Sequence, residues 1–562
     1  MELAVKSRIS QLVISGASLV TLAITPWLHV DAINLPKLMI LSSVSFSIFL
    51  LILVNRNVIR SFSDVPLFFS LSLFVLWLFV AFLFSGAPLN QQFWGVFGRQ
   101  NGLLSYVCLS MILFGASLFS DKRGYVKLLN GFLITAMLVT LYASIQKLGK
   151  DPVSWSQKMV FGTLGNINFY SAFAGMSALV ALLIAFSMHS NIFLKAGLVI
   201  LAVGNIYLAY DTGSIQGPMI FIAGIGVVGF LWLRSVKIGK FLLLPYLLIS
   251  VAGLILTCYG LANRGPLSKI VYAPSVTYRG DYWHAGWEMS VMKPIFGVGL
   301  DSYGDWYRQV RGLISTTRTN PERTANTAHN IFLDLSASGG FPLLLFYLLI
   351  LGCALRSSII YLRRTRTFDP YFTSIFVAWI MFLIQALISI GQIGVTVWGW
   401  VFTGALIGYE RVSRAQLPIE KNERTSKGKA GMKKASLQLS PTSAIAAIAG
   451  FGIGVALAFP PFNADLKFKD GLKSQNLSTL SKSTEIFGSN AYFKGFALQQ
   501  AAAKNDWSTA SILISQMTSN YPRDIFGWRM LYNKPNGTVA EKSQALARVK
   551  SLDPFNPDIP KT

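Results

Sequence analysis

The chain has 562 residues, of which 53% are hydrophobic and 13% are charged, with 49 Lys and Arg against 24 Asp and Glu. Apolar runs long enough to cross about 30 Å of hydrocarbon as a helix recur along most of it, which excludes a soluble multidomain protein. The net charge of +25 would suggest nucleic-acid binding in a soluble protein, but most of the surplus lies in short loops between apolar runs. We therefore predict an all-α polytopic membrane protein that binds membrane lipids and no nucleic acid.

Hydropathy predicts about 12–13 transmembrane helices. They begin near residues 9, 37, 66, 103, 128, 169, 193, 217, 241, 330, 372, 394 and 442. The first run follows MELAVKSR and is too long for a signal-peptide core, so we interpret it as a span. The three cysteines fall inside apolar runs, which is typical of packed side chains rather than a disulfide framework.

Alternate loops differ in charge, and this difference predicts the orientation. The basic set comprises RNVIR (56–60), DKRGYVK (121–127), RSVKIGK (234–240), RSSIIYLRRTRT (356–367) and the tract 411–436. By the positive-inside rule these loops and the N-terminus are cytoplasmic. The loops of the opposite set, including the long loop 263–328, then face outward from the cytoplasmic (inner) membrane.

Two domains are expected. Residues 1–461 form the transmembrane domain, and residues 462–562 form a polar, helical extracytoplasmic domain. In the second domain YPRD (521–524) and DPFNP (553–557) are separated by about 32 residues, which is near the period of a tetratricopeptide helical pair. Such pairs bury little core alone, so we expect them to dock on the outer face of the membrane domain or on a partner. An unrelated helical tail is the alternative.

The loop 263–328 carries more positive charge than the orientation rule favours on that side. It holds eight Lys and Arg against five Asp and Glu. Because arginine forks match phosphate oxygens with paired hydrogen bonds, the surplus indicates an anionic ligand. A solvated loop with ordinary ion pairs is the alternative. Within the loop, apolar residues of 283–292 recur at helical spacing and predict an amphipathic helix, with Arg279 just before its N-terminus.

His329 and Asn330 stand where this loop re-enters an apolar span. A neutral imidazole can take a proton from a hydroxyl at working pH, so His329 is a candidate general base, with Thr327 and Asn330 placed to orient the ring. An interfacial side chain that caps a helix is the alternative. Gly339, Gly340 and Pro342 follow and allow either a close approach or a break inside the membrane.

At these residues the chain resembles a known family. Arg279 with Trp283, the turn PIFGVGLDSYG (294–304) and AHNIFLDLSASGGFP (328–342) are similar to the O-antigen ligase and polymerase superfamily, as are GRQNGLL (98–104) and GTLGNINFYSAFAG (162–175). One departure concerns DTGSIQGP, where Ile215 and Gln216 stand at a place where members often carry an arginine.

The resemblance implies a metal-independent glycosyltransferase of the GT-C type without a cofactor. Its donor would be a glycan on undecaprenyl pyrophosphate, and its acceptor a hydroxyl of a lipid, a glycan or a protein. Arg279 would stabilise the leaving pyrophosphate and His329 would deprotonate the acceptor. The implied substrate-binding residues are Arg99, Lys158, Asn166, Asn168, Gln216, Arg308, Arg311 and Asn330.

Several rivals remain open. A polyprenyl-linked lipid flippase or another transporter would be expected to carry acidic or basic residues in mid-span, where Asp334 is the main exception and lies near a boundary. A transferase that uses phospholipid-linked monosugars typically has an acidic base in the first outward loop, where Asp31 is the sole candidate. Ligase, polymerase and protein O-glycosyltransferase share the same membrane chemistry, and the sequence does not separate them.

Overall fold

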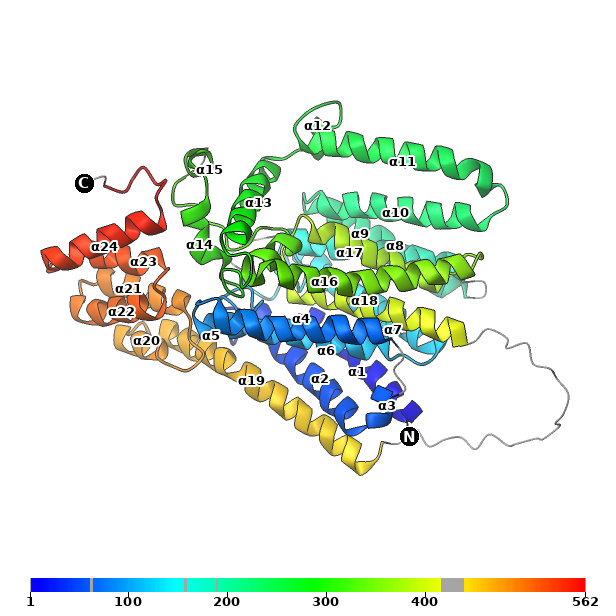
Figure 1. Ribbon diagram of the computed structural model, residues 1–562, viewed down its shortest axis with the longest axis horizontal. Coiled ribbons are helices and arrows are strands. Elements are labelled where there is room, and N and C mark those ends of the chain that lie inside the picture. Colours follow the sequence, from blue (N-terminus) through cyan, green and yellow to red (C-terminus); the bar gives the residue numbers. More distant parts are fainter. Residues whose placement is uncertain are drawn as a thin grey trace.

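A computed structural model describes residues 2–60, 64–155, 159–188, 191–318, 320–415 and 439–560, and this part of the chain contains helices but no strand (Figure 1). The helices of the first half are α1 (Glu2–Leu22), α2 (Asn34–Val54), α3 (Arg56–Arg60), α4 (Val65–Phe84), α5 (Leu89–Trp94), α6 (Leu103–Ser117), α7 (Lys122–Lys147), α8 (Ile167–Ser187), α9 (Ile192–Asp211), α10 (Gln216–Ser235) and α11 (Gly239–Leu261). The loop region and last spans comprise α12 (Ser268–Val271), α13 (Pro274–Met292), α14 (Tyr303–Val310), α15 (Leu313–Arg318), α16 (Ile331–Arg364), α17 (Pro370–Ala386), α18 (Ile393–Ala415) and α19 (Pro441–Ser474). The C-terminal helices are α20 (Leu477–Ser483), α21 (Ala491–Ala503), α22 (Trp507–Asn520), α23 (Ile525–Tyr532) and α24 (Val539–Leu552).

Every span predicted from hydropathy falls in one of thirteen long helices, α1, α2, α4, α6 to α11 and α16 to α19. In the described ranges, nine of these are long and apolar enough to cross a membrane, and α6 and α17 are shorter apolar helices. The predicted number of about 12–13 transmembrane helices is therefore higher than the nine helices of the described residues that meet both the length and the hydropathy criterion. Helix α1 carries Glu2, Lys6 and Arg8 in its first two turns, which lowers its apolar character.

The spans differ in how deeply they are packed. The apolar stretch of α8 is 89% buried, whereas that of α11 is not buried at all. A helix that is apolar on every side and buried lies at the centre of a bundle, while one that is apolar and exposed faces lipid. Figure 1 shows α11 at the edge of the bundle beside α10.

Helix α16 is kinked at Gly340, which confirms the predicted break. Gly340 has φ 77° and ψ 174°, and a Cβ there would lie 2.0 Å from the carbonyl oxygen of Ile295. The kink frees backbone groups that the turn before α14 uses: Val298 N–H donates to the carbonyl of Ala337 (2.8 Å), and Phe341 N–H donates to that of Pro294 (2.9 Å). The PIFGVGL turn is thus fixed in the break of α16.

The helix predicted over 283–292 is longer in the structure. Helix α13 begins at Pro274, so Arg279 lies inside its second turn and not before its first residue. The free backbone N–H groups of a helix belong to its first turn. The expectation that Arg279 lies just before the helix is therefore wrong, and the cause is Pro274, which is well suited to the first helical position.

The C-terminal helices form a second hydrophobic core. Its buried residues run from Ala464 near the end of α19 to Met517 in α22. Helix α19 continues from the apolar run into this core without interruption by a loop. In Figure 1 helices α20 to α24 gather at the same end of the bundle as α13, α14 and α15.

Candidate active site

The loops at this end of the bundle are joined by buried hydrogen bonds. Asn34 Nδ2 donates to the carbonyl of Gly98 (2.8 Å), and Gly98 N–H donates to Asp31 (3.2 Å). Asp301 accepts from the N–H groups of Val96 (2.7 Å) and Asn101 (3.2 Å). The loop that carries Asp31, the 95–102 segment and the long loop are therefore held together, because the 95–102 segment donates to a carboxylate of each of the other two.

Three side chains fix the backbone around His329, which lies directly before α16. Its φ of 53° falls in the left-handed region, which costs about 1 kcal/mol or more for a residue with a Cβ. Thr327 Oγ1 accepts from His329 N–H (3.1 Å), Asp334 accepts from Ala328 N–H (2.7 Å), and Asn330 Oδ1 accepts from Phe332 N–H (3.0 Å). These hydrogen bonds stabilise the otherwise unfavourable left-handed backbone conformation of His329.

The imidazole of His329 is oriented by two neighbours. Its Nδ1 lies 3.3 Å from both the carbonyl oxygen and the Oγ1 of Thr327, and in the tautomer with the proton on Nδ1 it donates to the carbonyl. The lone pair is then on Nε2. The ring packs on Tyr282 of α13 with 5.0 Å between centroids, and Tyr282 is buried.

Two guanidinium groups act on this ring. Burial, together with the positive charges of Arg99 and Arg279, lowers the pKa of His329 to about 4. The imidazole is consequently neutral at physiological pH. Arg99 Nη1 and Arg279 Nε are both buried and have no hydrogen-bond partner. Burial also lowers the pKa of each arginine, because the charged forms lose water.

A polar cavity of about 370 Å³ opens beside Arg99. It is bounded by Asp31 of the loop between α1 and α2, Asn34 at the start of α2, Asn166 directly before α8, and Gln392 directly before α18. A buried Arg99 donor without a partner next to an open polar space indicates room for an anionic ligand, while Arg279 and His329 are not among the residues that line this cavity. In the described ranges no three His, Cys, Asp or Glu side chains come together as metal ligands would.

Residues 197–348 match the O-antigen ligase family model. The matched O-antigen ligase segment runs from α9 into α16 and contains both Arg279 and His329. The resemblance that we drew from the motifs of the long loop is therefore confirmed, and the match supports a membrane glycosyltransferase of the O-antigen ligase and polymerase type. The stretches 98–104 and 162–175 lie outside the matched segment. No curated protein matches the chain.

The remaining predicted site residues have varied positions. Asn166 borders the cavity beside Arg99 and caps α8, while Asn168 accepts from Ser214 Oγ (2.8 Å). Gln216 is 3% exposed, and neither its Nε2 nor its Oε1 has a partner. Asn330 caps α16 through its Oδ1, and it is Thr327 rather than Asn330 that contacts the imidazole. Lys158 lies outside the described residues.

Arg308 and Arg311, predicted to bind substrate, have protein partners instead. Arg311 Nη2 donates to Asp553 at 2.7 Å and Arg308 Nη1 donates to the same carboxylate at 3.0 Å. Both also donate to the carbonyl of Pro321. Their charge is used to attach the DPFNP motif of the C-terminal helices to α14. These contacts dock the tail on the long loop, whereas the side of the membrane on which both lie stays a prediction.

Sequence reasoning missed Asp301, Asn326 and Gln392 at this site. Asp301 holds the loop that carries Arg99, and its left-handed φ of 53° is a signal that only the structure supplies. Gln392 lies within a short polar break, SIGQIG, between two apolar runs, and this break was the available clue. Asp31 accepts from Asn34 N–H (2.9 Å) and Gly98 N–H, so it holds two loops together.

Proposed function

We propose that the chain transfers a glycan from undecaprenyl pyrophosphate to an acceptor hydroxyl at the outer face of the cytoplasmic membrane, without a metal ion. The observation that carries this proposal is a neutral imidazole whose pKa is lowered by two guanidinium groups, each of which has a buried donor atom without a partner. One group can accept a proton while the others neutralise a diphosphate, which are the two demands of this reaction.

In the proposed step the acceptor oxygen attacks the anomeric carbon of the glycan, and the bond from that carbon to the pyrophosphate oxygen breaks. The proton of the hydroxyl moves to Nε2 of His329, and the electron pair of the broken bond stays on the pyrophosphate. Arg99 and Arg279 stabilise the negative charge that develops there. Because their charges lower the pKa of His329, a bound diphosphate would offset them and make the imidazole a stronger base.

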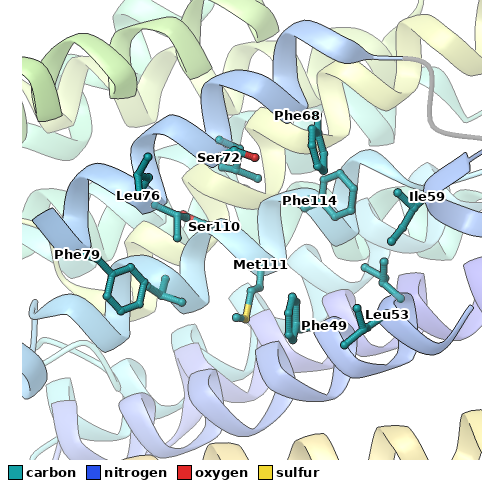
Figure 2. Close-up of a pocket in the computed structure, with 14 residues that line it drawn as sticks. Phe49, Leu53, Ile59, Phe68, Ser72, Leu76, Phe79, Ser110, Met111 and Phe114 are labelled. Carbon is teal, nitrogen blue, oxygen red and sulfur yellow. The ribbon is translucent and has the colours of Figure 1, made fainter. Parts of the chain in front are cut away.

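The polyprenyl chain needs an apolar path beside this site. An apolar groove of about 490 Å³ lies between α2, α3, α4 and α6, and Figure 2 shows Phe49, Phe68, Phe79 and Met111 around it. Helix α6, which forms one wall, begins four residues after Arg99. We assign the groove to the lipid tail. Met111→Trp, which fills it, should raise the KM for the lipid-linked donor and leave the amount of protein in the membrane unchanged.

The experiment that tests the function compares His329→Ala with His284→Ala in cells. His284 is an exposed histidine of α13, so it controls for loss of an imidazole in the same region. We expect His329→Ala to accumulate lipid-linked glycan and to lose the glycosylated acceptor in mass spectra of the envelope, while His284→Ala behaves as the wild type. Normal acceptor glycosylation in His329→Ala contradicts the base assignment.

The same mass spectra of the envelope also test two alternative functions, a polymerase and a protein O-oligosaccharyltransferase. A polymerase would lengthen the lipid-linked glycan, and a protein O-oligosaccharyltransferase would modify a protein, so the mass of the lost product separates them from a ligase. A flippase would move lipid-linked glycan across liposomes that contain the purified chain without forming a new bond. Transport without product would favour that rival.

A further inference from the structure

A second cavity of about 310 Å³ lies between the membrane domain and the C-terminal helices. One wall is the segment from Asn90 to Gln100, which includes the end of α5. The other wall is made by Pro461 of α19, the turn Gly488–Tyr492 that enters α21, and Tyr521 after α22. The cavity shares Phe97 and Asn326 with the cavity beside Arg99, so the two spaces are neighbours.

The polar groups of this cavity are uncharged. No Lys, Arg, Asp or Glu lines it in the described part of the chain, and five of its residues are primary amides. These amides are Asn90, Gln91, Gln100, Asn326 and Asn490. A primary amide offers both a donor and an acceptor, which is the pattern that a hydroxyl group matches. A phosphate or a charged peptide would find no counter-charge here.

Aromatic rings supply the apolar part of the lining. Trp94, Phe97, Tyr492 and Tyr521 all border the cavity. Phe97 and Tyr492 stack in parallel with 4.3 Å between their centroids, and Tyr492 is 49% exposed. A sugar ring has an apolar C–H face and a rim of hydroxyl groups, so aromatic faces together with amides suit both parts of it.

Two buried oxygen atoms in this lining have no partner. Ser489 is 6% exposed and its Oγ makes no hydrogen bond, and Gln100 is 3% exposed with an unpartnered Oε1. Gln100 hydrogen-bonds Asp31 through its side chain, so its orientation is fixed. A buried polar atom without a partner is costly, and most such atoms in native proteins are satisfied by a ligand or by water. Both atoms belong to residues that border the cavity.

We propose that this cavity binds a neutral sugar ring next to the transfer site. The assignment of that ring to the lipid-linked glycan or to the acceptor rests on the proposed function. The proposal that the cavity binds a saccharide does not depend on it. The C-terminal domain then completes a substrate site, since residues 488–492 and Tyr521 form one of its walls. This gives the docked helices a role in substrate recognition.

Ser489→Ala tests the site with little disturbance of the fold. The hydroxyl it removes has no protein partner, so thermal stability should stay at the wild-type value. Ser483→Ala is the matched control, because Ser483 is a buried serine of the same domain whose hydroxyl already donates to the carbonyl of Leu480. Tyr492→Ala, which removes one aromatic face, is a second variant of the site.

The probe is the oligosaccharide released by mild acid from the lipid-linked pool of the producing cells, and the measurement is saturation-transfer NMR on the full-length chain in detergent. KM values for lipid-linked donor and for acceptor are measured in parallel. We expect Ser489→Ala to weaken the binding seen by NMR or to raise the KM of one substrate about 2- to 10-fold, while its kcat stays at the wild-type value. The control Ser483→Ala should have wild-type NMR binding and wild-type KM values. A raised donor KM identifies the sugar as the donor's, and a raised acceptor KM identifies it as the acceptor's.

Wild-type values for NMR binding and for both KM values in Ser489→Ala and Tyr492→Ala would overturn the proposal. The outcome is separable from the proposed function. If the chain transfers no glycan but oligosaccharide binding depends on Ser489, the sugar site stands and the function fails. If transfer requires His329 but no sugar binding depends on Ser489 or Tyr492, the function stands and this site fails.

Discussion

Removal of the Asp553 carboxylate should undock the C-terminal helices. This carboxylate is fully buried and accepts from Arg311 at 2.7 and 3.0 Å, from Arg308 at 3.0 Å and from Asn556 at 3.0 Å. In Asp553→Ala the guanidinium of Arg311, whose side chain is 1% exposed, would remain buried without its counter-charge. Loss of one partner of a buried ion pair costs about 3–5 kcal/mol.

The structure places this cost near the lower end of that range. Arg311 keeps two carbonyl acceptors, those of Pro321 (2.7 Å) and Arg323 (2.8 Å), so its donors are not all left unsatisfied. A cost of about 3 kcal/mol corresponds to an increase of about 100-fold in the undocked population. Limited proteolysis of the purified protein measures this population, because cleavage follows the open form when closing is fast.

Asp558→Ala is the matched control, since Asp558 is an exposed aspartate in the same segment. It should be cleaved at the wild-type rate. The double variant with Arg311→Met should recover much of the protection, because removal of both charges of a buried pair is often nearly neutral. Equal protection of Asp553→Ala and Asp558→Ala, or no recovery in the double variant, would refute the reasoning.

Three further outcomes are expected. The acid limb of kcat/KM should lie near pH 4, where His329 becomes protonated in the free enzyme, so that activity is lost as the pH falls through this value. The acid limb of kcat should lie at higher pH, because bound diphosphate offsets the charges of Arg99 and Arg279 and so raises the pKa of His329 in the complex. Gly340→Ala should lower stability by about 1–3 kcal/mol in thermal unfolding, because its φ is 77° and a Cβ would meet a backbone carbonyl oxygen. Thr327→Val should reduce kcat about 10-fold with KM unchanged, because the hydroxyl that accepts from His329 N–H is lost.

Controls for these variants come from the same elements. Gly352→Ala lies in α16 with open space at the Cβ position and should leave stability unchanged or raise it slightly. Thr317→Val removes an exposed hydroxyl of the long loop and should leave kcat at the wild-type value. If the acid limb of kcat lies at the same pH as that of kcat/KM, or at a lower pH, this result would contradict the inference that diphosphate binding raises the pKa of His329.

The spans and the kink could be predicted from the sequence, because both depend on local properties. Hydropathy located every long helix of the membrane domain, since a run of apolar side chains in a bilayer has few alternatives to a helix. Gly339, Gly340 and Pro342 predicted the break in α16, because glycine tolerates a positive φ and proline lacks a backbone N–H. The candidate pair of Arg279 and His329 also came from the sequence, through motifs of the long loop.

The use of each arginine was decided only by tertiary structure. Arg99, Arg279, Arg308 and Arg311 are chemically alike, and the sequence assigned all of them to substrate. In the fold, Asp553 approaches Arg308 and Arg311 from more than 200 residues away, whereas Arg99 and Arg279 form no ion pair within the described residues. A local pattern fixes where a helix begins or bends, but the free energy of a charge depends on which distant carboxylate the folded chain brings to it.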